Sequence, residues 1–167
     1  EARGREGARM VGMMGQCADG VARIVAEVEI LLPRLLTEHK AKLAAKLRES
    51  MDAAAPGGFA HISGPELSER LAQEATLFAL RIDVAEELAR LRSHLEELQH
   101  LLSDGKGKPA GKRANGSAGK RLDFLFQEMN REANTLGSKA GSLEVTRAAM
   151  DLKLLIEQMR EQAQNIE

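Results

Sequence analysis

The sequence predicts an all-α fold, a long-helix hairpin or bundle with coiled-coil-like packing. Two long stretches place apolar residues at alternating spacings of four and three, the heptad pattern of helices that pack lengthwise against partners. No stretch resembles a strand-rich domain. The 167 residues are enough for one domain with a moderate core.

The first expected helix covers residues 1–52. Pro33 is expected to kink it, because a proline removes one intrahelical hydrogen bond and crowds the preceding turn. Since the sequence begins at Glu1 rather than Met and residues 2–9 already read as helix, we expect a segment to precede this chain. A loop rich in Ala, Pro and Gly is expected over residues 53–64. The apolar seam of the first helix consists of Met10, Met14, Cys17, Val21, Ile24, Val28, Leu31 and Leu35.

The second expected helix covers residues 65–102, and Pro65 and Glu66 suit its first turn. An unbroken heptad seam consists of Leu77, Leu80, Val84, Leu88, Leu91, Leu95, Leu98 and Leu102. A second apolar strip, pointing almost the opposite way, consists of Leu71, Phe78, Ile82, Ala85 and Ala89. A helix that is apolar on two sides is expected to be buried on two sides, by a bundle neighbour and by another subunit.

Residues 103–119 are expected to form a basic flexible linker, because the stretch is rich in Gly, Ala and Lys and holds a single acid, Asp104. The alternative is a mobile basic arm that binds polyanions. Residues 120–167 are expected to form a C-terminal helical pair. Gly137 is expected to end its first helix as a C-cap, and Ser142 to cap its second helix.

Charge and composition exclude several classes of function. With 24 basic and 25 acidic residues, the whole chain is not a polyanion-binding surface, so any basic patch must be local. The absence of Trp and Tyr makes base-stacking platforms scarce. The one cysteine, Cys17, excludes a disulfide framework, and no apolar run is long enough to span a membrane. We therefore expect a cytoplasmic protein without a membrane partner, and motifs of NTPases, zinc hydrolases and acyl transferases are absent.

Polar residues gather on the expected helix that begins at Lys120. One flank of its apolar stripe carries Asp123, Gln127, Asn130 and Asn134, and the other flank carries Glu128 and Glu132. Arg131 lies opposite the core, and Phe124 also faces away from it, which hints at a second interface. Two Asn residues within a helix are unusual, because Asn is a poor helix former. The pattern fits either a solvated face with interhelical hydrogen bonds or a site where amides and carboxylates bind a ligand or metal.

A second polar line, formed by Asp83, Glu87 and His94, lies on one flank of the second helix's seam. Carboxylates one turn apart can share a divalent cation, and oxygen ligands suit Mg²⁺ or Mn²⁺. A histidine beside them could carry a proton. Such lines also occur as salt-bridged edges of coiled coils, so a purely structural role stays open.

Several segments of the chain resemble the signature of the YicC/YloC-like endoribonuclease family. The similar segments are residues 119–125, 127–139, 81–88, 90–91, 93–94, 157–162 and 165–167, and residues 5–7 resemble an earlier helical segment of the family. The resemblance implies a stress-associated bacterial cytoplasmic protein that cleaves single-stranded or small regulatory RNA with a divalent metal. It also implies a homo-oligomeric ring such as a hexamer, and an N-terminal domain outside this chain.

The resemblance and the residue patterns together assign roles to individual side chains. Catalytic roles are expected for Glu128, Glu132, His94 and Asp123. RNA contacts are expected from Arg81, Arg121, Asn130, Arg131, Asn134, Lys139 and Arg160. A Mg²⁺ or Mn²⁺ ion, which would activate a nucleophile and neutralise developing charge, is expected on Asp83, Glu87, Glu128 and Glu132.

Other mechanisms and functions remain open at this point. Without a metal, the RNA 2′-hydroxyl would attack the phosphodiester and His94 would act as the base. A non-enzymatic alternative is an oligomerisation module, and another is an RNA-binding adaptor that serves a partner exoribonuclease.

Overall fold

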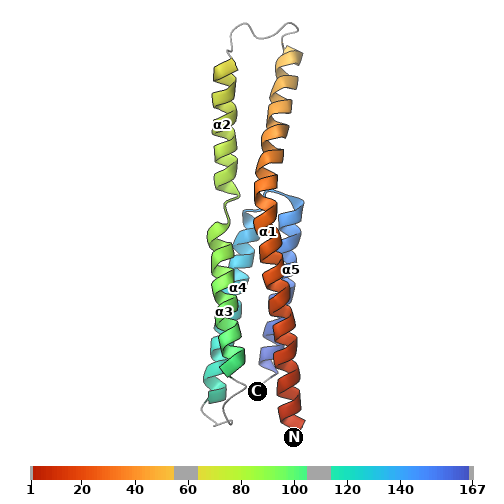
Figure 1. Cartoon of the computed structure of the whole chain (residues 1–167), viewed down its shortest axis with the longest axis vertical. Helices are drawn as coiled ribbons and strands as arrows, with labels where there is room; N and C mark the ends of the chain where they lie inside the picture. Colours follow the sequence, from red (N-terminus) through yellow and green to blue (C-terminus); the bar gives the residue numbers. More distant parts are fainter. Residues whose placement is uncertain (1, 55–63, 105–113, 166–167) are drawn as a thin grey trace. The chain divides into compact units, whose positions relative to one another are not determined.

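The computed structural model describes residues 2–54, 64–104 and 114–165 of the chain. In these ranges it has five α-helices and no strand, which confirms the all-α prediction (Figure 1). The helices are α1 (Ala2–Ala54), α2 (Gly64–Arg81), α3 (Ala85–Asp104), α4 (Ala114–Ser138) and α5 (Leu143–Gln164). None of the described helices is long and apolar enough to cross a membrane.

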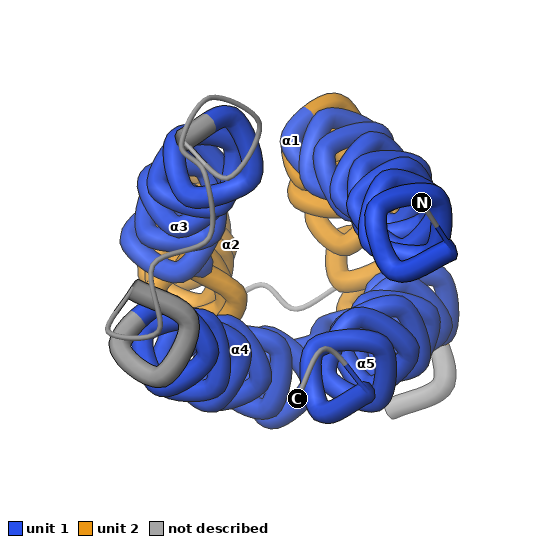
Figure 2. Tube along the Cα trace, turned by 90° about the horizontal axis from the view of Figure 1, so that it is seen from below, with its two compact units in different colours: residues 1–29, 84–167 blue, residues 30–83 orange. Residues whose placement is uncertain are grey.

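The chain divides into two compact units, which are described separately (Figure 2). The bundle unit consists of residues 1–29 and 84–167, and the hairpin unit consists of residues 30–83. The bundle unit therefore contains the first part of α1 together with α3, α4 and α5, and the hairpin unit contains the rest of α1 together with α2.

Figure 2 shows the four helical segments of the bundle unit arranged around a common centre. Almost all of their buried side chains are apolar. The first helix contributes the seam expected from the heptad pattern, since Met14, Val21 and Val28 are buried. The largest buried side chains of the other three helices are Leu91, Leu98, Phe126, Met129, Leu136, Leu152, Ile156 and Met159. Each such side chain contributes about 1.5–3 kcal/mol when it is fully removed from water.

Helices α4 and α5 approach closely where small residues face each other. A Cβ atom added to Gly137 would lie 3.4 Å from the Cβ atom of Ala149. The prediction that Gly137 ends the helix is wrong, because α4 continues through it to Ser138. The glycine instead leaves room for the neighbouring helix. The second cap is confirmed: Ser142 Oγ accepts a hydrogen bond from the Val145 backbone N–H at 3.2 Å.

The hairpin unit is fastened by a stack of rings from its two helices. The rings of His39 and Phe78 lie nearly parallel, with their centroids 3.6 Å apart. The Arg81 guanidinium lies 5.7 Å from the centroid of the Phe78 ring, within the range of a cation–π interaction. The buried apolar residues of this unit also include Leu35 and Ile82.

The prediction of one continuous helix over residues 65–102 is wrong. Helix α2 ends at Arg81 and α3 begins at Ala85, so three residues between them are not helical. The buried side of the chain changes at this break. Helix α3 buries its part of the predicted seam, at Leu88, Leu91, Leu95 and Leu98. In α2, Leu77 and Leu80 are instead 56% and 67% exposed, and Phe78 of the opposite strip is buried.

The boundaries of the expected linker also differ from the structure. Helix α3 includes Asp104, and α4 begins at Ala114, so residues 114–119 are helical rather than part of a linker. A helix that is already formed extends at little cost, which outweighs the poor helix propensity of this Gly-containing stretch. The remainder of the expected linker, residues 105–113, lies outside the described residues, as do residues 55–63 of the expected loop.

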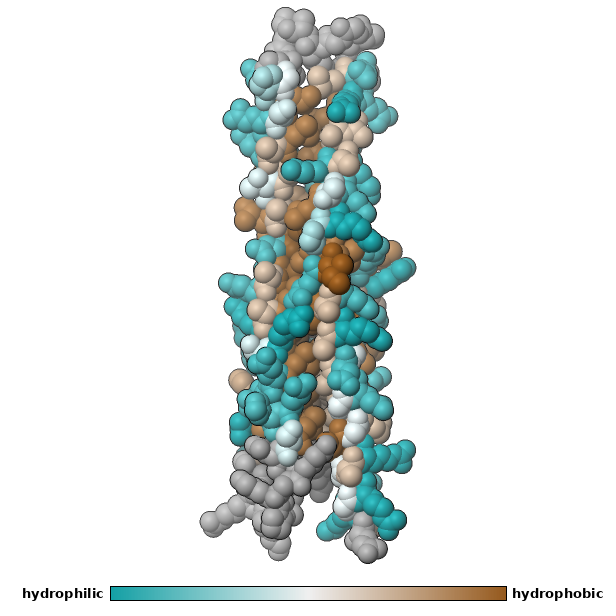
Figure 3. All heavy atoms as spheres, viewed as in Figure 1, coloured by the Kyte–Doolittle hydropathy of each residue, from teal (hydrophilic) through white to brown (hydrophobic). Residues whose placement is uncertain are grey.

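Helix α1 continues through Pro33, and the kink expected there stays a prediction. The distribution of hydrophobic and hydrophilic residues on the surface otherwise agrees with the heptad patterns of the sequence. On the face drawn in Figure 3, hydrophobic residues lie along the furrow between helices, while hydrophilic residues cover the outward surfaces.

Candidate functional site

Two polar clusters of the bundle unit contain several of the side chains singled out by the sequence. The Glu87 cluster consists of Glu87 and Arg90 of α3, Glu132 of α4, and Lys139, which directly follows α4. The Asp123 cluster consists of three residues from α4 and α5: Asp123, Gln127 and Arg160. Helix α4 contributes to both clusters and carries the longest of the segments that resemble the endoribonuclease signature.

The Glu87 cluster places two carboxylates in the interior of the bundle unit. Glu87 and Glu132 are 4% and 5% exposed, and they are the only buried charged residues of the described part of the chain. Glu87 Oε1 accepts a hydrogen bond from Lys139 Nζ at 2.8 Å. Glu132 Oε2 lies 3.7 Å from a terminal nitrogen of Arg90. Removing a charge from water costs several kcal/mol, so a buried carboxylate requires such a partner.

One oxygen of Glu87 is not compensated in this way. Glu87 Oε2 is buried and has no hydrogen-bond partner within the described structure. Leaving a buried acceptor unpaired costs about 1–3 kcal/mol, and more when the group is charged. This oxygen is therefore an acceptor that can take a further hydrogen-bond donor.

The cations of the Glu87 cluster extend from the buried carboxylates to the surface. The side chain of Lys139 is 40% exposed and that of Arg90 is 54% exposed. Arg90 also donates a hydrogen bond to the exposed Glu86, one turn earlier on α3, at 3.1 Å. The cluster thus combines buried carboxylates with positive charge that an anionic ligand can reach.

The carboxylates predicted to hold a metal do not form one ligand set. Asp83 belongs to the hairpin unit, whereas Glu87, Glu128 and Glu132 belong to the bundle unit. Among the described residues there is no group of three or more His, Cys, Asp or Glu side chains that could hold a metal ion. Two of the predicted ligands, Glu87 and Glu132, are instead paired with the cations of Lys139 and Arg90.

The Asp123 cluster joins α4 to α5. Asp123 Oδ1 accepts a hydrogen bond from Arg160 Nε at 3.2 Å, and Oδ2 accepts one from Gln127 Nε2 at 3.0 Å. Both oxygens of this carboxylate therefore hold other side chains in place. The Asp123 and Arg160 side chains are 44% and 38% exposed. The carboxylate of this ion pair is therefore much more exposed to solvent than that of the Glu87–Lys139 pair.

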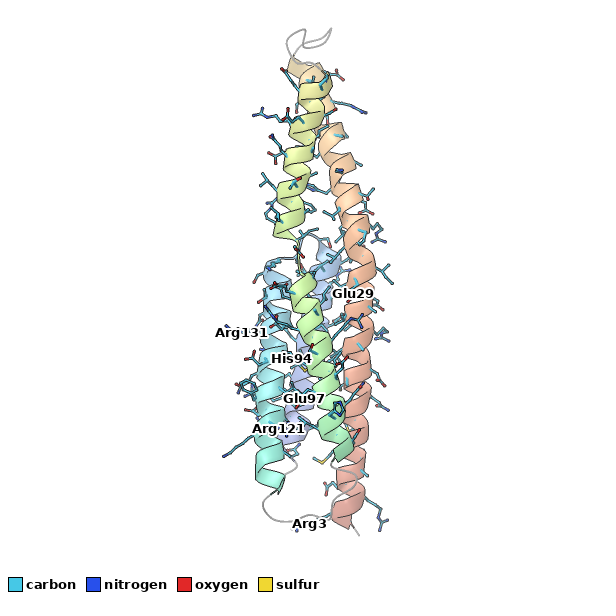
Figure 4. All side chains as sticks on the ribbon, turned by 60° about the vertical axis from the view of Figure 1, so that its left-hand side comes forward. Arg3, Glu29, His94, Glu97, Arg121 and Arg131 are labelled. Atoms are coloured by element: carbon cyan, nitrogen blue, oxygen red, sulfur yellow. The ribbon has the colours of Figure 1, made fainter. Side chains whose placement is uncertain are left out.

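Arg121 and Arg131, both expected to contact RNA, differ in their surroundings. Arg121 donates a hydrogen bond to Glu97 of α3 at 2.8 Å, and Figure 4 shows the two side chains together between α3 and α4. Arg131 is exposed and points away from the bundle (Figure 4). Arg121 is thus partly used in joining two helices, whereas Arg131 is open to solvent.

The remaining predicted residues are not brought into either cluster by side-chain hydrogen bonds. His94, Glu128 and Asn130 are half-buried, and Asn134 is exposed. Within the described ranges, none of these four side chains makes a hydrogen bond or ion pair. Arg81 lies in the hairpin unit, where it stacks on Phe78.

Some polar contacts were not expected from the sequence. No role was expected for Arg90, although it lies three residues after Glu87 and one turn after Glu86. Arg92 of α3 makes a bidentate pair with Glu29 of α1, with distances of 2.6 and 2.9 Å. The hydrogen bond from Arg92 lowers the pKa of Glu29 below its ordinary value. No local spacing signals a pair whose members lie 63 positions apart.

Cys17 has the properties of a structural residue. Its Sγ atom lies 3.6 Å from Gln158 Oε1 of α5, and burial raises the pKa of its thiol. A reactive cysteine needs a lowered pKa, so Cys17 is not an activated nucleophile.

Comparison with known proteins agrees with the sequence signature. Residues 28–167 match the family model described as "Endoribonuclease YicC-like, C-terminal". The chain is 38% identical over 165 residues to the probable endoribonuclease YicC of Haemophilus influenzae, covering 99% of this chain and 50% of that protein. It is 30% identical over 169 residues to the probable endoribonuclease YicC of Clostridioides difficile, covering 100% of this chain and 50% of that protein. The chain thus spans half the length of these curated relatives.

Proposed function

Because this chain belongs to the YicC-like endoribonuclease family, whose C-terminal region it carries, we propose that it supplies the RNA-cleaving site of an endoribonuclease. The family resemblance inferred from the sequence is confirmed. The proposed substrate is single-stranded or small regulatory RNA, and the proposed site is the Glu87 cluster together with the neighbouring face of α4.

The observation that carries this proposal is the pair of buried carboxylates, Glu87 and Glu132. Purely structural ion pairs are usually placed at the surface, because burial of both charges often costs more than their attraction returns. A buried polar atom without a partner, such as Glu87 Oε2, needs an explanation, and a catalytic role is one such explanation. Both carboxylates lie within the segment that matches the family model.

The chemistry of RNA cleavage suits this arrangement. The reaction needs a group that accepts a proton from the attacking oxygen and positive charge that stabilises the developing negative charge on the phosphate. In the proposal, Lys139 and Arg90 contact the phosphate from the exposed side. Glu87 and Glu132 fix these cations, and the unpaired Glu87 Oε2 is available to accept a proton.

The half-buried His94 and Glu128 are proposed as further proton carriers beside this cluster. Neither side chain has a hydrogen-bond or ion-pair partner among the described residues, so each is able to act on a ligand. The other expected RNA contacts, from Arg81, Arg121, Asn130, Arg131 and Asn134, stay predictions. The expected Mg²⁺ or Mn²⁺ also stays a prediction, and no part of the proposal depends on it, because the predicted carboxylates do not form a ligand set.

Assembly into a homo-oligomeric ring is a separate proposal. Its support is an apolar strip on the outer face of α5, where Leu143, Met150 and Leu154 are 63%, 60% and 63% exposed. These positions are 7 and 4 residues apart and therefore share one side of the helix. The strip favours packing against a second copy, and it is also what a non-enzymatic assembly module would carry.

The test is a cleavage assay of the full-length protein on end-labelled single-stranded RNA, with and without EDTA. Glu132→Gln removes, at nearly constant size, the charge that fixes Arg90, and is expected to lower the cleavage rate about 100-fold or more, as the loss of a contact that stabilises the transition state does. Glu96→Gln, an exposed position of α3, is the matched control and is expected to cleave normally. Wild-type cleavage by the folded Glu132→Gln protein would contradict the proposed site. Inhibition by EDTA would support the metal requirement.

A further inference from the structure

A groove beside the Asp123 cluster combines an aromatic ring with basic and amide groups. It has a volume of about 420 Å³, and the lining residues that matter here are Lys120, Asp123, Phe124, Gln127, Arg160 and Gln164. The groove lies between α4 and α5 of the bundle unit, and the hydrogen-bonded Asp123 is one of its lining residues.

Phe124 is exposed, and the packing of the core does not explain its place at the surface. Of the three phenylalanines that the structure describes, Phe78 and Phe126 are buried, whereas Phe124 is 64% exposed. The core side of this turn is already filled by Leu122, Leu125 and Phe126. An exposed ring in a chain without Trp or Tyr is therefore a group that packing alone does not explain.

Positive charge flanks the ring. Lys120 is exposed, lies one helical turn before Phe124, and makes no hydrogen bond or ion pair within the described part of the chain. Arg160 uses Nε to bind Asp123, so the carboxylate holds the guanidinium in place while its terminal nitrogens remain available. A fixed arginine and a nearby lysine suit a phosphate group, and the terminal nitrogens of a guanidinium match two of its oxygens.

We propose that this groove is a binding subsite for one nucleotide of single-stranded RNA, with its base stacked on Phe124 and its phosphate held by Lys120 and Arg160. The inference rests on the proposed function, because it assigns a second contact to the same substrate. The amides of Gln127 and Gln164 lie at the groove to meet the edge of the base. Each base offers a π-face, so stacking tolerates different sequences.

The subsite also gives a physical reason for a preference between kinds of RNA. In a duplex, each base is already stacked and paired, whereas an unpaired base can turn toward an aromatic side chain. Phe124 therefore selects unpaired nucleotides before any chemistry takes place. The competing occupant of the groove is a second copy of the protein. An apolar patch that another protein covers is poorly served by a lining of two cations, two amides and a single ring.

The proposal is tested by the affinity of the full-length protein for a fluorescent single-stranded 2′-O-methyl RNA, measured by anisotropy, with gel analysis showing that the RNA stays intact. Phe124→Ala is expected to weaken binding about 5- to 150-fold, the range observed when a stacking aromatic is removed. Phe124→Tyr keeps the ring and is expected to bind within about threefold of wild type. The matched control is Ile30→Ala, an exposed apolar truncation at a position 77% exposed, which is expected to bind as wild type.

A second pair of variants separates the phosphate contacts from the stacking contact. The double substitution of Lys120→Gln with Arg160→Gln is expected to weaken binding and to reduce the dependence of affinity on salt, because fewer counterions are released from the RNA. Phe124→Ala is expected to leave that salt dependence unchanged.

The outcomes distinguish the subsite from the proposed function. Wild-type RNA affinity in the Phe124→Ala protein would overturn the subsite and leave the endoribonuclease proposal standing. Failure of the wild-type protein to bind or cleave RNA would remove both. A smaller particle mass in light scattering for Phe124→Ala, with unchanged RNA affinity, would identify the ring as a protein contact and would also overturn the subsite.

Discussion

The Glu87 and Asp123 clusters use the same chemical parts in different surroundings. Each joins α4 to a neighbouring helix through a carboxylate and a cation. The Glu87 side chain is 5% exposed, whereas that of Asp123 is 44% exposed. The carboxylate of Asp123 has both oxygens hydrogen-bonded, and that of Glu87 has one buried oxygen without a partner. This difference is the reason for our proposal that the buried cluster carries the proton chemistry and that the exposed cluster positions the substrate.

The largest expected effect on stability comes from leaving the Glu87 charge alone in the interior. We expect Lys139→Met to lower the free energy of unfolding by about 2–3 kcal/mol, less than a fully buried pair would lose, because Lys139 is partly exposed. Urea unfolding followed by circular dichroism measures this change. Adding Glu87→Leu to Lys139→Met should recover most of the loss, since an apolar pair no longer buries a charge. A loss below 0.5 kcal/mol would show that Glu87 is effectively solvated.

The equivalent substitution in the Asp123 cluster is expected to have a smaller effect. Arg160→Met removes the cation from a carboxylate that water already reaches, so the loss should be about 0–1 kcal/mol in the same urea experiment. Equal losses for Lys139→Met and Arg160→Met would mean that the two clusters do not differ in the way their burial indicates.

The smallest expected effect is that of the Glu29–Arg92 pair between α1 and α3. The hydrogen bond from Arg92 lowers the pKa of Glu29, so the stabilisation is present above the unfolded-state pKa of about 4.3 and is lost as pH falls through the lower folded-state pKa. We expect Glu29→Gln to lower Tm slightly at pH 7, and the difference from wild type to disappear near pH 3. A difference that grows on acidification would contradict the assigned direction.

How far the sequence predicts the fold is clearest at the boundary between α2 and α3. The heptad spacing correctly predicts the buried faces of α1 and α3, because these helices are long and regular. The same spacing continues across the break, since Leu80, Val84 and Leu88 follow one another at intervals of four. No Gly or Pro marks the break, and the only local signal is the low helix propensity of Ile82, Asp83 and Val84. A helical wheel therefore cannot show that the apolar side changes there.

The sequence predicts which helices carry the polar residues of the candidate site, but not how these residues pair. A wheel places Glu132 on the flank of the apolar stripe, but only packing against α3 determines that it is buried. The pairing of Glu87 with Lys139 joins residues 52 positions apart, and that of Asp123 with Arg160 joins residues 37 positions apart. Such pairs depend on the register between helices, which one sequence does not reveal. The same register leaves Phe124 beside Arg160 at the groove.

The central claim is that the Glu87 cluster performs chemistry and that the Asp123 cluster positions RNA. The most direct measurement is the single-turnover cleavage rate of the full-length protein at saturating RNA for Glu87→Gln and Asp123→Asn, with folding checked by circular dichroism. We predict that Glu87→Gln lowers this rate about 100-fold or more, and that Asp123→Asn changes it less than about fivefold while raising the RNA concentration needed for saturation. The reverse result, a normal rate for Glu87→Gln and a collapsed rate for Asp123→Asn, would contradict the account.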